Sequence, residues 1–275
     1  MQNKDYPSIK NVIHLCLAFT GLHLLSGILT EVLLYGLSVT GIVLSETMGN
    51  IVFILCLMTV YILMIKYLIK KSYVKKVHFF QWQKLNPTVI FLFLVLFSGA
   101  TLVFSEINYL LYFILPMPSF LVDIFNQAFT LDSLLLSLLL IVIIPAVCEE
   151  ILFRGFILFG LKRHYSPHKS IFISSLLFGL VHLNPWQFLT AFLLGLIFGW
   201  IAVKTESIIL PILGHTLNNL MALISVRYFA MEINPPDQFE LQPFWLDLTG
   251  ILLCILGFYF LHQYFKNVSV KKEIL

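Results

Sequence analysis

Eight apolar runs that can cross a lipid bilayer constrain the fold of this chain more than any other feature. They lie at about 11–36, 47–69, 88–105, 131–160, 169–184, 186–203, 207–227 and 244–265. Because a bilayer core offers no water to backbone N–H and C=O groups, spanning segments of this kind are expected to be helical. With 59% hydrophobic and 11% charged residues, the chain of 275 residues is too apolar for a water-soluble globule. We therefore predict an all-α, polytopic membrane helix bundle of about eight transmembrane helices, without a nucleic-acid partner.

Charged residues divide between the two faces that eight crossings would create. Fifteen of the 17 Lys and Arg residues fall in the N-terminal segment, the second, fourth and sixth connections, or the C-terminal segment, all on one face. The opposite face carries acidic side chains, among them Glu46, Glu106, Asp123 and Asp237. By the positive-inside rule, both termini are predicted to be cytoplasmic. We expect a multi-pass protein of the cell membrane, and the compact chain favours a bacterial inner membrane.

Three ionisable side chains interrupt the apolar run at 131–160. Glu149, Glu150 and Arg154 follow the stretch 134–147, which carries no charge. A charge at the centre of a membrane helix costs about 2.5–3.5 kcal/mol on insertion scales, so it calls for a partner or a function. Glu150 and Arg154 are four residues apart and share a helix face, where they can neutralise each other. Glu149 is rotated by about 100° from Glu150, so we expect Glu149 to be free for chemistry and the Glu150–Arg154 pair to be structural.

Two further pairs lie in later apolar runs at helical spacing. Phe178 and His182 form an F-x-x-x-H pattern, and His215 and Asn219 form an H-x-x-x-N pattern. Residues four apart lie on one helix stripe, so each pair can project into the bundle, where polar groups find partners away from lipid. At about 1.5 Å of rise per residue, the polar residues of the three motifs lie roughly 13 to 21 Å from the basic face. They are therefore predicted to form one site near the middle of the bilayer.

Simpler explanations stay open for several polar residues. A single histidine in a membrane helix is commonly a packing or hydrogen-bonding residue, and we interpret His14 and His23 in this way. Asn218 is as well placed by spacing as Asn219. Pro145 predicts a helix kink near the site that frees a backbone carbonyl.

The three motifs together resemble those of the CPBP family of intramembrane glutamic proteases. That family includes the CAAX prenyl endopeptidase Rce1 and relatives linked to bacteriocin self-immunity. Its E-E-x-x-x-R, F-x-x-x-H and H-x-x-x-N motifs occur here in order, within about residues 131–227. The resemblance implies an all-helical bundle with a cavity around these residues. The chain then divides into N-terminal transmembrane helices at 1–130, a CPBP-like protease core at 131–227, and an outer loop with a C-terminal transmembrane helix at 228–275.

The resemblance also implies a role for each motif residue. Glu149 would be the catalytic glutamate, and His182 its partner on the nucleophilic water. His215 and Asn219 would line the site and stabilise the oxyanion. The remaining motif residues would support the site structurally: Glu150, Arg154 and Phe178. We thus predict a metal-independent endopeptidase that opens to the cytoplasm, acts on a peptide or membrane-protein substrate and needs no cofactor.

Two other functions fit the same residues. Two carboxylates and two histidines could hold zinc, although the sequence lacks H-E-x-x-H and adjacent glutamates on one helix chelate poorly. The bundle could instead be a non-catalytic membrane scaffold or a bacteriocin-immunity partner that binds another membrane protein. The three ordered motifs favour the protease over both alternatives.

Overall fold

The structure, a computed structural model, describes residues 7–71, 85–229 and 241–274. Every regular element in these ranges is helical, and seven of the helices there are long and apolar enough to cross a membrane. The prediction of a polytopic, all-α membrane protein is therefore confirmed. The basic connection at 72–84 and most of the predicted outer loop, 230–240, lie outside the described residues.

The helices are described in chain order from the N-terminus. The N-terminal part contains α1 at Ile9–Val39, α2 at Glu46–Lys71, α3 at Pro87–Ile114 and the short α4 at Ser119–Phe129. A continuous helix then runs over Leu134–Leu161, here called the motif helix. Its parts are α5 at Leu134–Ser137, η3 at Leu138–Ile143, α6 at Ile144–Glu150, η4 at Ile151–Leu158 and α7 at Phe159–Leu161. The last four helices are α8 at Pro167–Leu180, α9 at Pro185–Thr205, α10 at Ile209–Phe229 and α11 at Phe244–Ile274.

Three helices start at an Asn-Pro or Ser-Pro pair. The residue before each of α3, α8 and α9 caps the helix: its side chain accepts a hydrogen bond from the backbone N–H of the third helical residue. The capping residues are Asn86, Ser166 and Asn184. Such a cap satisfies an N–H that has no partner within the helix. Proline follows at the first helical position, where its missing N–H costs nothing. These pairs set where the helices of the bundle begin.

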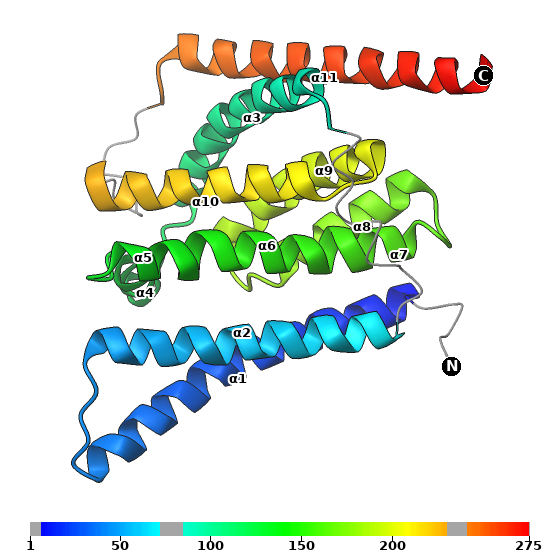
Figure 1. Ribbon diagram of the computed structural model, residues 1–275. Helices are drawn as coiled ribbons and strands as arrows, with labels where there is room; N and C mark the ends of the chain where they lie inside the picture. The colour runs from blue at the N-terminus through cyan, green and yellow to red at the C-terminus, as the bar shows by residue number, and fades with distance from the viewer. Residues whose placement is uncertain (1–6, 72–84, 230–240, 275) are drawn as a thin grey trace.

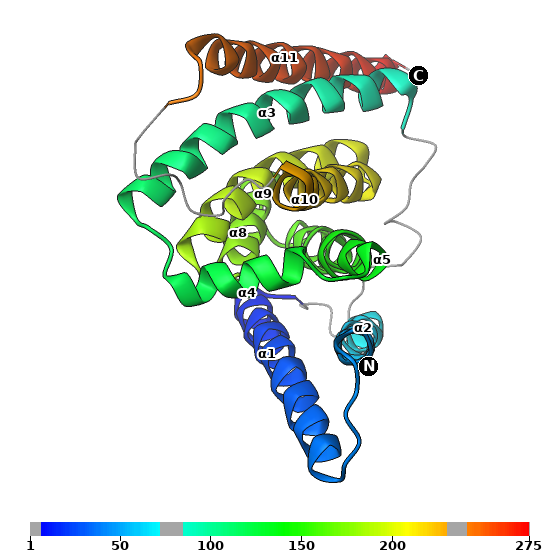
Figure 2. The ribbon, with the colours of Figure 1, turned by 90° about the vertical axis from the view of Figure 1, so that its left-hand side faces the viewer.

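The α1–α2 hairpin stands at one end of the bundle, and α3 and α11 lie side by side at the other (Figures 1 and 2). The close approach of α3 and α11 depends on glycine. A Cβ on Gly99 would lie 2.5 Å from the backbone nitrogen of Cys254, and a Cβ on Gly257 would lie 2.6 Å from that of Leu96. The motif helix, α8, α9 and α10 fill the space between these two pairs. The start of α1 and the end of α11 lie on the same side of the bundle (Figure 1).

The run at 169–184, predicted as a span, forms a shorter helix than expected. Helix α8 has 14 residues and is thus roughly 21 Å long, less than the hydrocarbon core of about 30 Å. It ends early because the Asn184 cap and Pro185 start a new helix. Leu183 reverses the chain in the left-handed region, with φ of 58°, which costs about 1–2 kcal/mol for a residue with a side chain. Helices α8 and α9 pack against each other as a hairpin.

Buried apolar side chains form two main clusters. The first joins α1, α2, the motif helix and α8, and includes Phe19, Phe153 and Phe178. The second joins α3, α9, α10 and α11, and includes Phe93 and Phe198. The polar residues of the motif helix therefore lie between two clusters of buried apolar side chains.

Candidate active site

Glu150 and Arg154 form a completely buried ion pair. Nη1 of Arg154 donates to Oε1 of Glu150 at 2.8 Å, and both side chains are 0% exposed. His215 on α10 joins them, with its Nδ1 at 3.0 Å from the same carboxylate oxygen. The spacing of the first two residues predicted their contact, whereas nothing local predicted the third member. Removing one partner of such a buried pair leaves a charge without compensation, so these three side chains depend on one another.

Aromatic rings and a glycine enclose this ion pair. The guanidinium carbon of Arg154 lies 4.2 Å from the centroid of the Phe178 ring and 5.7 Å from that of Phe198. The His215 ring is next to the same two rings, at 5.7 Å and 6.4 Å between centroids. Gly195 makes room for the cation, because a Cβ there would lie 3.1 Å from Nη2 of Arg154. The charged group thus receives cation–π contacts where water is excluded.

The motif helix departs from regular α-helical winding on both sides of the glutamates. It is π-helical at η3 and again at η4, which flank α6. Such segments occur frequently at functional sites. Pro145 has no N–H to offer the carbonyl of Ile141 four residues earlier. The side chain of Asn219 supplies one instead, because its Nδ2 donates to that carbonyl at 2.9 Å. The predicted free carbonyl is therefore paired, and Asn219 ties α10 to the motif helix.

Glu149 has a different environment from its neighbour. It is half-buried, and its Oε1 accepts a hydrogen bond from the hydroxyl of Tyr61 at 3.4 Å. Its Oε2 is buried and makes no hydrogen bond with the residues that the structure describes. Buried polar atoms without partners are rare, because each one forfeits its hydration. Oε2 of Glu150 is also buried without a hydrogen-bond partner among the described residues, but the Glu150 side chain is 0% exposed. Glu149 is thus the more accessible glutamate of the pair.

His182 lies in the turn that follows α8. Its Nδ1 is 2.8 Å from the carbonyl oxygen of Phe178. In the neutral ring Nδ1 therefore carries the proton, and Nε2 is left as an acceptor. His23 on α1 interacts electrostatically with both His182 and Glu149. Glu149 and His182 therefore lie near the same part of α1, while His215 and Asn219 are bonded to Glu150 and Ile141.

Comparison with known families bears on the same segment. Residues 131–221 match a family model described as type II CAAX prenyl endopeptidase Rce1-like. We call this segment, about a third of the chain, the Rce1-like domain. It spans the motif helix, α8, α9 and more than half of α10, and it contains all three motifs. The family resemblance inferred from those motifs is thereby confirmed, and it supports an intramembrane CAAX-type protease. No curated protein and no solved structure matches the chain.

Two residues from outside the Rce1-like domain belong to the surroundings of Glu149 and were not predicted: Tyr61, which contacts it, and His23, which packs against Tyr61. Tyr61 lies on α2, 88 residues from Glu149, and His23 on α1 had been interpreted as a packing residue. In the sequence, the signal for Tyr61 was its position in the middle of an apolar run, because a buried tyrosine hydroxyl needs a hydrogen-bond partner. The helices that precede the Rce1-like domain therefore contribute to the surroundings of its glutamate.

The Rce1-like domain does not present a ligand set for zinc. Among the residues that the structure describes, no three His, Cys, Asp or Glu side chains are grouped to hold a metal ion. Oε1 of Glu150 is already paired with Arg154 and His215. A zinc site needs three or four ligands at close to tetrahedral geometry, so these residues do not fit the metalloprotease alternative.

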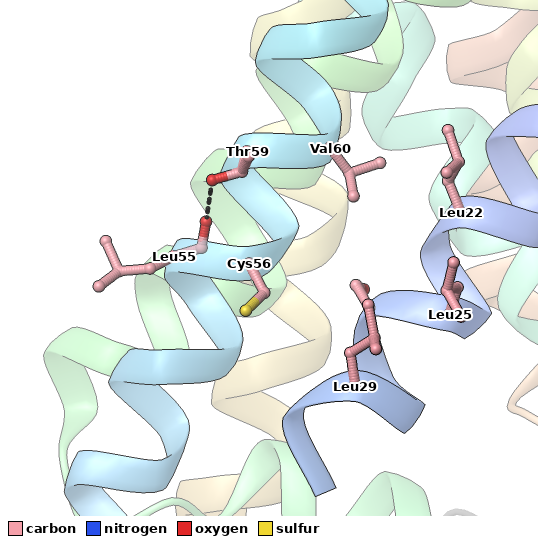
Figure 3. Close-up of a pocket in the computed structure, with 8 residues that line it drawn as sticks. Leu22, Leu25, Leu29, Leu55, Cys56, Thr59 and Val60 are labelled. Carbon is pink, nitrogen blue, oxygen red and sulfur yellow. Dashed lines mark hydrogen bonds between the residues drawn. The ribbon is translucent and has the colours of Figure 1, made fainter. Parts of the chain in front are cut away.

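Two cavities lie outside the Rce1-like domain, between α1 and α2. The one in Figure 3 has a volume of about 340 Å³ and is lined by Leu22, Leu25, Ser26, Leu29, Leu55, Cys56, Thr59 and Val60. Its lining is mostly aliphatic, and the hydroxyl of Thr59 is bonded to the carbonyl of Leu55 at 2.8 Å. Neither cavity is lined by a residue of the three motifs.

Proposed function

We propose that this chain is an intramembrane glutamic endopeptidase that hydrolyses a peptide bond with water activated by Glu149 and His182, without a metal ion. The observation that carries the proposal is the contrast between adjacent carboxylates. Both Oε2 atoms lack a hydrogen-bond partner among the described residues, but Glu150 is fully buried and bonded through Oε1 to Arg154 and His215. Glu149, in contrast, is half-buried, and its Oε1 accepts a hydrogen bond from Tyr61. The match of residues 131–221 to a CAAX-type endopeptidase family supports the reaction class.

Glu149 and His182 would act together on one water molecule. As the water oxygen attacks the carbonyl carbon of the substrate, Glu149 takes one of its protons. Nε2 of His182 holds the other hydrogen, because Nδ1 is committed to the carbonyl of Phe178. Glu149 then gives its proton to the amide nitrogen as the C–N bond breaks, which yields a carboxylic acid and an amine. General base catalysis of this kind contributes about 10²–10⁴ in rate.

His215 and Asn219 would stabilise the oxyanion that forms during the attack. Nδ1 of His215 is bonded to Glu150, so Nε2 is the nitrogen left for the substrate. With a proton on Nε2 as well as on Nδ1, His215 would be an imidazolium, and its Nε2–H would donate a hydrogen bond to the oxyanion. The carboxylate of Glu150 would stabilise the positive charge of this ring. The amide of Asn219 gives one N–H to Ile141 and has a second to offer. Fixed donors aimed at developing charge are commonly the largest electrostatic contribution to catalysis.

The same proposal includes an orientation in the membrane. Basic residues lie in the last turns of α2 and α9, at Lys70, Lys71 and Lys204, and these ends lie on the side of the bundle where α1 begins (Figure 1). By the positive-inside rule this side faces the cytoplasm, so both termini would be cytoplasmic and the site would open there. The membrane would be the inner membrane of a bacterium.

The proposal is tested by comparing the peptides in membranes that carry the parent chain, Glu149→Gln, or Glu31→Gln as a control. Glu31 is an exposed glutamate on α1, so its amide variant changes the same functional group away from the site. We expect fragments that the parent and Glu31→Gln produce and Glu149→Gln does not. Identical fragments in all three membranes would overturn the proposal. A Glu149→Gln, His182→Ala double variant that keeps every cellular effect of the parent would favour the scaffold alternative.

A further inference from the structure

A tyrosine from the α1–α2 hairpin contacts the glutamate of the Rce1-like domain. The Tyr61 side chain is 2% exposed, and its hydroxyl lies 3.4 Å from Oε1 of Glu149. This distance is long for an O–H···O hydrogen bond. Catalytic hydrogen bonds are often long before substrate binds and shorten in the reactive complex. The contact joins two parts of the chain that are far apart in sequence.

We propose that Tyr61 is a positioning residue that holds the carboxylate of Glu149 so that Oε2 faces the water it activates. This inference rests on the proposed function. The hydroxyl can donate only one hydrogen bond, and a carboxylate in a site that excludes most water is a strong acceptor for it. With Oε1 held, the orientation of Oε2 is fixed as well, because the two oxygens belong to one planar group.

The surroundings of Tyr61 prevent its ring from moving away. Its centroid lies 5.7 Å from that of Phe19 and 6.1 Å from that of His23, both on α1. Phe19 in turn packs edge-on against Phe153 of the motif helix, at 6.2 Å between centroids. The tyrosine is therefore fixed by aromatic contacts to α1, and α1 is fixed to the helix that carries Glu149. This arrangement makes the α1–α2 hairpin part of the machinery that orients the base.

The hydrogen bond is tested without knowledge of the natural substrate. Infrared difference spectra between the reconstituted parent chain and Glu149→Gln isolate the carboxyl bands of Glu149. Tyr61→Phe keeps the ring and removes the hydroxyl, so it should shift those bands. Tyr67→Phe is the matched control, because Tyr67 lies on the same helix with 49% of its surface exposed. Glu149 bands that coincide in the parent and Tyr61→Phe would overturn the inference.

The positioning role is tested by kinetics on a quenched fluorescent peptide whose sequence is first identified as cleaved in membranes of the parent. Misplacing a catalytic group by about 1 Å can cost 10²-fold in rate; for Tyr61→Phe, which removes one long hydrogen bond, we expect kcat to fall about tenfold with KM unchanged. Tyr67→Phe should match the parent in both constants. A Tyr61→Phe variant with the kcat of the parent, or one that changes only KM or the unfolding temperature, would overturn the positioning role. Glu149→Gln with the rate of the parent would refute the proposed function instead, and the infrared bands would still decide whether Tyr61 binds Glu149.

Discussion

Glu149 and Glu150 are neighbours in sequence and differ in nearly every physical respect. Glu150 is 0% exposed and shares one oxygen between Arg154 and His215. Glu149 is half-buried, and its single hydrogen bond to a described residue comes from a distant tyrosine at 3.4 Å. A rotation of about 100° along the helix separates a fully buried carboxylate held by an ion pair from a half-buried one, which we propose is the base.

The comparison shows how a membrane helix can carry two carboxylates without losing its fold. A buried charge is tolerated when it is paired, and the loss of one partner is then costly. An unpaired ionisable group in a membrane protein marks a functional site by default. We therefore expect substitution of Glu150 to lower the free energy of unfolding and substitution of Glu149 to lower the cleavage rate. Variants that change one of these two quantities without the other test this expectation.

The largest effect is expected from His182, which we propose holds the water together with Glu149. His182→Ala should lower the cleavage rate by about 10²–10⁴, the usual contribution of a positioned acid–base group. Among the described residues its ring makes one hydrogen bond, to the carbonyl of Phe178, and the backbone bonds of residue 182 persist in the variant, so the unfolding temperature should change little. His14→Ala is the control, because His14 is an exposed histidine on α1. If His182→Ala and His14→Ala cut equally fast, His182 has no part in the reaction.

The next largest effect is expected on stability, at the paired glutamate. Glu150→Gln should lower the free energy of unfolding by about 3–5 kcal/mol, because Arg154 would remain buried without its counter-ion. Unfolding in detergent measures this loss. Glu31→Gln, at an exposed position of α1, should change the same quantity by less than about 1 kcal/mol. Equal stability of the two variants would show that the buried ion pair has no structural role.

Asn219 should contribute to stability on a smaller scale. Asn219→Ala removes the donor to the carbonyl of Ile141 that Pro145 cannot satisfy, and a buried acceptor without a partner costs about 1–3 kcal/mol. Asn218→Ala is the matched control, since among the described residues the Asn218 amide donates to its neighbour Asn219 and not to the motif helix. Thermal unfolding of both variants should place Asn219→Ala well below Asn218→Ala. The reverse order would contradict the bracing of the kinked helix by α10.

The smallest effect is expected at the glycine beside the ion pair. In Gly195→Ala, the new methyl would lie 3.0 Å from Cβ of Ser175 and 3.1 Å from Nη2 of Arg154, and such overpacking typically costs about 1–3 kcal/mol. Because the clash is slight, we expect the lower end of this range. Gly21→Ala is the control, because a Cβ at Gly21 meets no atom within 4 Å. A Gly195→Ala protein as stable as Gly21→Ala would show that the side chains around Arg154 can accommodate an additional methyl group.

The features that could be predicted from the sequence are those set by local spacing. Apolar runs predicted the membrane helices, and the four-residue interval predicted the contact between Glu150 and Arg154. The early end of α8 also had a local signal, the Asn184-Pro185 pair, which was outweighed by the apolar run. Pro145 gave a local signal for a kink, but neither the π-helical winding on both sides of the glutamates nor the contact of Asn219 with Ile141 could be predicted from spacing.

The contacts that cross long stretches of chain could not be predicted in this way. His215 binds Glu150 across 65 residues, and Tyr61 reaches Glu149 across 88. Their side chains sit in ordinary apolar runs, where hydrophobic patterning gives no information about which helix lies opposite. Only the packing of α2 and α10 against the motif helix decides which glutamate each side chain meets.

The central claim is that Glu149 is the base and has no large structural duty. Its most direct test is the cleavage rate of reconstituted Glu149→Gln on a peptide first identified in membranes of the parent, measured together with the unfolding temperature. We predict the unfolding temperature of the parent and a cleavage rate lower by about 10³. A Glu149→Gln protein that cuts this peptide as fast as the parent does would contradict the claim.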